Sequence, residues 1–156
     1  MNETSKARSS GLDEFLAWVP LHPRFWRRQK ARVHVKRGFE NYVAGKSHEA
    51  VVEYGRALDY EPTWTDVLLQ RAMASFRRED FKAAEQDCTR ALEIRPRDAD
   101  ALLHRASARI ALGEHDSAIE DCEQVLEDES QAPGAFVSRA VARYSRGEVD
   151  AAIEDL

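Results

Sequence analysis

The sequence lacks the features that secretion and membrane insertion require. It has 156 residues, of which only two are cysteine, five proline and seven glycine. Two cysteines do not make a disulfide framework, so we expect an intracellular, reducing compartment: the cytoplasm first, with an organelle left open. No stretch approaches the roughly 18 apolar residues of a membrane-spanning helix. The first residues also lack the apolar core of a secretory signal.

Catalytic and metal-binding motifs are also missing. The sequence has no glycine-rich phosphate loop, no nucleophile elbow and no paired His–Glu metalloprotease motif. Cys88 and Cys122 are expected to be core residues, and His104 and His115 stand elsewhere on their predicted helices, which disfavours a zinc site. We therefore predict a protein that is not an enzyme and that uses neither a cofactor nor a metal.

The charges are present in both signs but unevenly placed. The net charge is −5, which by itself does not suggest a nucleic-acid partner. Residues 1–39 hold nine basic and three acidic residues, a balance of +6, and the remaining 14 basic and 25 acidic residues give −11. A basic N-terminal segment therefore precedes an acidic remainder.

A 34-residue period runs through the chain from residue 31 onward. It divides the sequence into units 31–64, 65–98, 99–132 and a partial unit 133–156, whose positions we number from 1. Apolar residues recur within each unit at helical spacing, so each unit is predicted to contain two helices. Position 8 is always Gly or Ala and position 20 always Ala, which indicates helices that cross closely. The columns at positions 7, 20 and 23 read Arg37, Arg71, Arg105 and Arg139; Ala50, Ala84, Ala118 and Ala152; and Glu53, Asp87, Asp121 and Asp155.

The ends of the predicted helices are marked by glycine and proline. Position 15 is Gly45, Gly113 or Gly147 in three units, where a turn between helices can use positive φ. The second unit has Glu79 there, so its turn should differ or be strained. Pro62 and a proline 34 residues later end the second helix, because proline cannot continue it.

These residues resemble the tetratricopeptide repeat family. The first unit carries the pattern in Gly38, Gly45, Ala50, Tyr54, Ala57 and Pro62. The chain departs from it at His34, where a large apolar residue is usual, and at Cys88, which replaces an aromatic residue. The resemblance implies an all-α fold, a right-handed superhelical solenoid of antiparallel helix pairs, in which the first helix of each pair lines a concave groove.

Positions 7 and 23 predict a ladder of ion pairs inside the stack. Position 7 is usually apolar in this family, yet here it is arginine in every unit, and position 23 is always a carboxylate. We expect each arginine to meet a position-23 carboxylate of its own or the adjacent unit, since a guanidinium engages a carboxylate at two points. The alternative is a row of arginines that binds an anionic ligand.

The resemblance also implies which residues line the groove. The predicted groove residues are mostly apolar: Val35, Lys36, Phe39, Leu69, Gln70, Met73, Leu103, His104, Val137 and Val141. Members that bind chaperone tails hold the terminal carboxylate with Lys, Asn, Asn, Lys and Arg. The matching positions here are Val35, Phe39, Gln70, Asp100 and His104, so a chaperone C-terminal tail is disfavoured as the ligand.

The first 30 residues leave three interpretations open. Residues 1–10 are polar and predicted to be disordered. Residues 11–30 combine aromatic and basic side chains, and Pro23 can start a helix that continues into the first unit. The segment is a cap on the stack, a docking site for protein or RNA, or an attachment to an anionic membrane surface. The candidate docking residues are Trp18, Arg24, Phe25, Trp26, Arg27 and Arg28.

Together these features predict a protein–protein interaction module, an adaptor or a subunit of a larger assembly. Its groove would bind an apolar peptide or an amphipathic helix, unless the chain's own N-terminus occupies it. The alternative is a structural subunit that contacts RNA or an anionic membrane through its N-terminal segment. The sequence stops within the last unit, so we expect truncation or a partner that covers the C-terminal edge.

Overall fold

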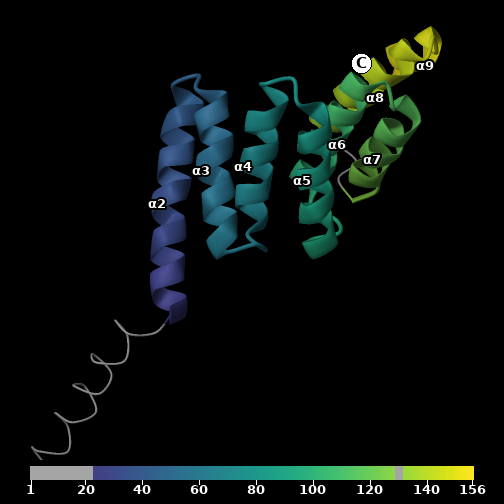
Figure 1. Ribbon diagram of the computed structural model, residues 1–156. Coiled ribbons are helices and arrows are strands. Elements are labelled where there is room, and N and C mark those ends of the chain that lie inside the picture. The colour runs from purple at the N-terminus through teal and green to yellow at the C-terminus, as the bar shows by residue number, and fades with distance from the viewer. Residues whose placement is uncertain (1–22, 129–131) are drawn as a thin grey trace, which may run out of the picture.

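The computed structural model describes residues 23–128 and 132–156. Within these ranges the chain forms eight helices and no strand, laid side by side in chain order (Figure 1). The helices are α2 (Pro23–Val43), α3 (Ser47–Tyr60), α4 (Thr65–Phe76), α5 (Phe81–Ile94), α6 (Ala99–Leu112), α7 (His115–Asp128), α8 (Pro133–Ser145) and α9 (Val149–Glu154). The predicted disorder of residues 1–10, and the part of the cap or docking segment before residue 23, lie outside the described residues.

Each unit is an antiparallel pair of helices, as the period predicts. The first helices of units 2, 3 and 4 begin at Thr65, Ala99 and Pro133, the residues at position 1. In the first unit, α2 already begins at Pro23 and runs without interruption to Val43. Residues 23–30 are therefore the first turns of the first repeat helix.

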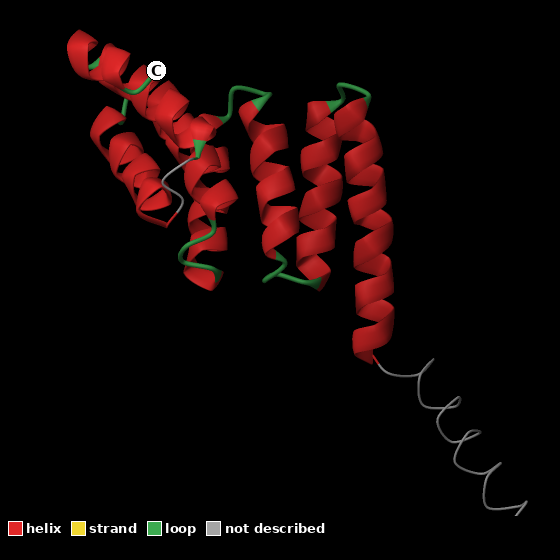
Figure 2. Cartoon of the chain, turned by 180° about the vertical axis from the view of Figure 1, so that it is seen from behind, coloured by secondary structure: helices red, strands yellow, loops and turns green. Residues whose placement is uncertain are grey.

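Consecutive helices pack together along the whole array, and the first helices of neighbouring units also contact one another. Thus α4 lies against α2 and α6, and α6 lies against α8. Figure 2 shows the pairs from behind, with the later pairs turned away from α2 and α3. The first helices of the four pairs, α2, α4, α6 and α8, line one face of the array. The second helix of each pair lines the other face.

The four turns inside the units share one backbone conformation. Gly45, Gly113 and Gly147 have φ of 77°, 81° and 86°, and Glu79 has φ of 62° at the same position. In every turn the position-15 amide donates to the position-12 carbonyl, and the position-16 amide donates to the position-11 carbonyl. The second unit therefore keeps the common turn, and Glu79 adopts a backbone conformation that non-glycine residues avoid.

Small residues allow the two helices of a unit to approach closely. The position-20 alanines are all buried, as are Ala72, Ala106 and Ala140 at position 8. In the first unit a Cβ on Gly38 would lie only 2.7 Å from the ring of Tyr54. The second and third units have a buried alanine at position 8, and a buried cysteine, Cys88 or Cys122, at position 24, where the first unit has Tyr54. A larger residue at position 8 thus goes with a smaller one at position 24.

Candidate functional site

A pocket on the face formed by the first helices is the main candidate site. Its volume is about 230 Å³, and we call it the central pocket. It is formed by Tyr42 of α2, Ala72, Met73 and Phe76 of α4, Arg77, Ala84 of α5, and His104 and Ser107 of α6. Its lining residues come from three consecutive units, so its shape depends on how the units stack.

The walls of the central pocket are held by aromatic and cationic contacts. The guanidinium carbon of Arg77 lies 4.6 Å from the centre of the Tyr42 ring. Arg77 also donates a hydrogen bond of 3.0 Å to the Tyr42 carbonyl oxygen. Phe76 packs edge-on against Phe81, with ring centres 5.1 Å apart. The cation of Arg77 is therefore engaged by its neighbours at the rim of the pocket.

One polar group in the wall of the central pocket, His104, favours its neutral form. Burial lowers the pKa of His104, because the charged imidazolium loses its hydration there. The carboxylates of Asp100 and Asp98 act in the opposite direction with a smaller effect. His104 therefore offers a hydrogen-bond donor and an acceptor at neutral pH, but no positive charge for a carboxylate.

The predicted groove residues do not all lie in one site. They lie in two pockets, in or against the core, and on the exposed surface. Met73 and His104 lie together in the central pocket. Val35 and Leu103 pack partly against the core, and Leu69 is a member of it. Lys36 and Phe39 are exposed on α2, and Gln70 is half-buried. Val137 and Val141 line a separate pocket on α8 and α9.

Two walls of the central pocket are not among the predicted groove residues. Tyr42 and Phe76 both occupy position 12, which the helical pattern assigns equally well to core or groove. The structure shows that both contribute to the pocket. Their signal was the aromatic residue repeated at one position, and which face it lines depends on the rotation of each helix.

Three of the predicted arginine–carboxylate pairs form, each within its own unit. Arg71 donates to Asp87 through Nε at 2.7 Å and Nη2 at 2.5 Å. The last pair, Arg139 with Asp155, has the same two-point geometry, and so does the pair in the third unit, Arg105 with Asp121. The three aspartates are buried. Their arginines are thus engaged inside the stack, which leaves them unsuited to hold an external anion.

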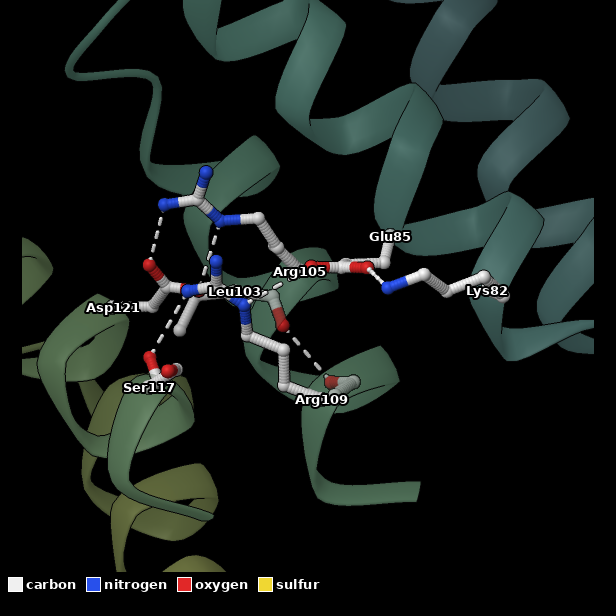
Figure 3. Close-up of polar contacts among 8 residues, drawn as sticks. Lys82, Glu85, Leu103, Arg105, Arg109, Ser117 and Asp121 are labelled. Atoms are coloured by element: carbon white, nitrogen blue, oxygen red, sulfur yellow. Dashed lines mark hydrogen bonds and ion pairs between the residues drawn. The ribbon is translucent and has the colours of Figure 1, made fainter. Parts of the chain in front are cut away.

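A second arginine reinforces the ladder in the last two units, and Figure 3 shows the one in the third unit. Arg109 Nη1 lies 2.8 Å from Asp121 Oδ2 and also donates to the Ser117 carbonyl oxygen. Its Nε lies 3.5 Å from Glu85 of the preceding unit, whose other contact is Lys82. Arg109 stands at position 11, which was not predicted to join the ladder because it is Asn or Ser in the first two units. Arg109 therefore ties the third unit to the second.

Arg143 has the corresponding role in the last unit. Its Nη1 lies 2.9 Å from Asp155, and its Nη2 lies 3.9 Å from Glu123 of the unit before. The hydrogen bond from Arg139 and the charges of both arginines hold the pKa of Asp155 below its usual range. Asp155 consequently stays ionised in the fold.

The predicted pair in the first unit does not form. Glu53 lies 2.8 Å from Nδ1 of His34 and 2.5 Å from Nη1 of Arg56, and Arg37 is exposed. The expected Arg37–Glu53 pair was therefore wrong. His34 stands at position 4 on α2 and reaches the carboxylate first, whereas no described helix precedes α2 to cover Arg37. The hydrogen bond from His34 is the main cause that lowers the pKa of Glu53.

The candidate docking residues at the N-terminus are only partly described. Trp18 lies outside the described residues, and Arg24 lies in the first turn of α2. Phe25 and Trp26 are exposed and meet edge to face. Arg27 and Arg28 line a second pocket with Tyr60, Glu61, Pro62, Thr63 and Trp64, which we call the N-terminal pocket.

The cysteines and other ligand-type residues show no site in the described ranges. Cys88 and Cys122 are free thiols, and burial raises the pKa of each to about 12. Residues 23–128 and 132–156 contain no group of three or more His, Cys, Asp or Glu arranged to hold a metal. In the same ranges no helix has the length and hydropathy needed to cross a bilayer.

Comparison with known proteins identifies the repeat. Two sequence profiles of the tetratricopeptide repeat match residues 75–129 and 103–156. No curated protein sequence matches the chain significantly. Among solved structures, the first repeat domain of Spaghetti (RPAP3), bound to the HSP90 peptide SRMEEVD, is 31% identical with a TM-score of 0.73, and the match covers 77% of this chain and 95% of that one.

Two other solved structures support the same assignment. The repeat domain of Arabidopsis OM64 is 28% identical with a TM-score of 0.71, and the match covers 76% of this chain and 98% of that one. The crystal structure of MamA matches in fold, with 21% identity, a TM-score of 0.75, and coverage of 99% and 91%. The chain belongs to the tetratricopeptide repeat family, and its fold is the right-handed superhelical solenoid of antiparallel helix pairs that the sequence predicts.

Proposed function

We propose that this chain is a non-enzymatic protein-interaction module whose central pocket receives an apolar anchor of a peptide or amphipathic helix. The observation that carries the proposal is the lining of the pocket: Met73, Phe76 and Tyr42 form apolar walls, and His104 favours its neutral form. Its volume of about 230 Å³ lies below the ~300–1,000 Å³ of sites that enclose a small molecule. A pocket of that size suits an anchoring side chain of a longer ligand.

Structural neighbours support the general class of ligand. The Spaghetti domain is bound to an HSP90 peptide, and the second repeat domain of human RPAP3, 25% identical, is in complex with the HSP70 peptide SGPTIEEVD. Both peptides end in Glu-Glu-Val-Asp. We propose a different ligand here, because the five positions that would clamp a terminal carboxylate hold no lysine or arginine. One of them, Asp100, is an exposed acid that would repel it.

The proposal is tested by selecting peptides on the full chain from a random library. We expect the selected sequences to carry apolar residues at i, i+3 or i+4 and to bind with little dependence on salt. Met73→Glu should weaken their binding at least about tenfold, because it places a charge against the apolar walls. Ser107→Phe should do the same by filling the pocket.

Fluorescence anisotropy measures both effects, and circular dichroism shows whether each variant keeps its helix content. Glu154→Gln is the matched control, since Glu154 is exposed on α9, away from the pocket. Selection of acidic peptides that require a free C-terminal carboxylate would contradict the proposal. So would peptides whose affinity is unchanged in both pocket variants.

A second candidate function rests on the N-terminal pocket. Arg27 and Arg28 are exposed, and they line this pocket together with Tyr60 and Trp64. Cations next to aromatic rings suit a polyanion with stacking groups, such as single-stranded RNA. A steep fall in RNA affinity with rising salt, lost in an Arg27→Ala/Arg28→Ala variant, would favour this function. Equal binding to anionic vesicles would instead assign the segment to a membrane surface.

A further inference from the structure

The central pocket holds polar atoms that a purely apolar anchor would leave without partners. His104 and Ser107, both on α6, stand in its lining beside apolar side chains of α4. The Ser107 hydroxyl donates a hydrogen bond of 2.9 Å to the carbonyl oxygen of Leu103, one turn earlier in the same helix. Its proton is thus used within α6, while its oxygen can still accept a hydrogen bond from a ligand.

The ring of His104 has hydrogen-bonding capacity that the described residues do not use. Among residues 23–128 and 132–156, no group forms a hydrogen bond with either of its ring nitrogens. The neutral ring, which burial favours here, carries one N–H donor and one acceptor nitrogen. A ligand that fills the pocket takes water away from this ring, and an apolar ligand offers no hydrogen bond in exchange. The pocket therefore favours a ligand that brings a hydrogen-bonding group to His104.

The charges around the pocket disfavour an ionised anchor. A carboxylate would lose its hydration against Met73 and Phe76, and the neutral ring of His104 offers it no positive charge. The guanidinium of Arg77 is already engaged by the ring and the carbonyl oxygen of Tyr42. A lysine or arginine anchor would be repelled, because it would bring a second cation next to Arg77. The group that meets His104 should therefore be polar and uncharged.

The apolar walls favour an aromatic ring as the body of the anchor. Tyr42 and Phe76 supply aromatic rings to the lining, and Met73 supplies a thioether. A ligand ring packs favourably against both, edge to face with other rings and through sulfur–aromatic contacts. Serine and threonine have a hydroxyl but little apolar surface for these walls, and phenylalanine has the surface but no polar group. Tyrosine and tryptophan combine the two properties.

Tyrosine suits His104 better than tryptophan does. A phenol hydroxyl both donates and accepts, so it pairs with the imidazole whichever ring nitrogen carries the proton. An indole N–H only donates, so it requires the unprotonated nitrogen. We infer that the central pocket selects a tyrosine anchor whose hydroxyl is hydrogen-bonded to His104, an inference that rests on the proposed function and names the anchor.

Two small ligands that differ by one hydroxyl group test this selection. They are N-acetyl-tyrosine amide and N-acetyl-phenylalanine amide, each titrated into the full chain. Met73 lines the pocket, and Met1 is the one other methionine of the chain, so isotope labelling of methionine methyl groups gives two signals, which Met73→Leu assigns. We expect both compounds to shift the Met73 signal. The tyrosine compound should bind about three to ten times more tightly, the effect of one net hydrogen bond.

Three variants assign the preference to His104. His104→Leu should bring the two affinities to about the same value, because leucine offers no hydrogen bond. His104→Gln should retain most of the preference, since an amide also donates and accepts, and a merely structural role of the ring would not give this rescue. His48→Leu is the matched control, because His48 is exposed on α3, outside the pocket lining. Circular dichroism checks that each variant keeps its helix content.

Equal affinities of the two compounds for the parent chain would overturn the inference. So would a preference that persists in His104→Leu, one that disappears instead in Ser107→Ala, or tighter binding of N-acetyl-tryptophan amide. In each of these cases a ligand still enters the pocket, and the proposed function stands. If none of the compounds shifts the Met73 signal, the inference fails and the proposed function fails with it.

Discussion

The first and third units have the same backbone plan and different solutions to its packing. The first unit sets Gly38 against the ring of Tyr54, and the third has buried Ala106 and Cys122 at the same two positions. The first unit satisfies Glu53 with His34 and Arg56, and the third satisfies its buried aspartate with two arginines. The two units thus keep the same spacing between their helices and a carboxylate with hydrogen-bonding partners. They differ in the side chains at these positions, and a change at one position goes with a change at the position that faces it.

The largest expected effect on stability comes from removing the position-23 carboxylate, which has different partners in the first and third units. Asp121→Ala leaves Arg105 and Arg109 without their carboxylate in a buried site, at a cost of about 3–5 kcal/mol in the free energy of unfolding. Glu53→Ala should cost about 1 kcal/mol, because Arg56 is exposed and an exposed ion-pair partner keeps its hydration when the carboxylate is removed. Urea unfolding followed by circular dichroism measures both.

The control for this pair is Asp116→Ala, which removes an exposed ion pair with Arg146. We expect a change below about 1 kcal/mol, as for other surface pairs. Equal losses for Asp121→Ala and Asp116→Ala would show that the buried ladder adds nothing beyond a surface contact.

The next effect tests compensation in the apolar half. Gly38→Ala should destabilise the protein by about 1–3 kcal/mol, because its Cβ would overlap the Tyr54 ring. In a Tyr54→Cys background, which copies the third unit, the same change should cost nothing or stabilise. A double-mutant cycle of unfolding free energies gives the coupling directly. Additive effects would mean that the ring and the glycine are independent.

A smaller effect sharpens the comparison at the turns. Glu79→Gly should stabilise the protein by about 0.5–1 kcal/mol, because it relieves a positive φ at a residue with a Cβ. Gly113→Ala should destabilise by a similar amount, and it isolates the backbone effect, since nothing lies within 4 Å of that Cβ. Thermal unfolding should show opposite shifts in melting temperature. Shifts of the same sign would refute the strain at Glu79.

The smallest effect is the pH dependence of the two terminal pairs. The folded pKa of Glu53 lies below its ordinary value of 4.5, and that of Asp155 below 3.8. Their stabilisation is complete above the ordinary values and is lost as pH falls through the lowered ones. Melting temperatures from pH 6 to about pH 2 should fall less steeply in Glu53→Gln and Asp155→Asn than in the parent. Parallel curves would exclude both groups as contributors.

Much of the fold follows from the period alone. The 34-residue spacing places the starts of α4, α6 and α8 at the predicted residues, because small, apolar and turn residues recur with it. The sequence also predicts the close approach of the two helices at position 8 and the pairing of arginine at position 7 with aspartate at position 23. These are interactions within one unit, where the period fixes both partners.

The missed features depend on neighbours that the period does not specify. Arg37 stands at unit position 7, as do the arginines that form the ladder in the other three units. No described helix precedes α2 to enclose its side chain. Arg109 lies 3.5 Å from Glu85 across a junction, and the predicted groove residues that line pockets fall into two of them, one formed by α2, α4, α5 and α6 and the other by α8 and α9. Which side chains meet across units is set by small rotations of whole helices.

The two buried thiols can be used to measure local opening of the array, because each is alkylated only when its surroundings open. Cys88 and Cys122 occupy the same position in adjacent units, and neither reacts as a thiolate while it stays enclosed, since burial raises its pKa to about 12. Alkylation must therefore wait for each unit to open. Alkylation rates at Cys88 and Cys122, distinguished by mass spectrometry, would show whether neighbouring units open together or one at a time.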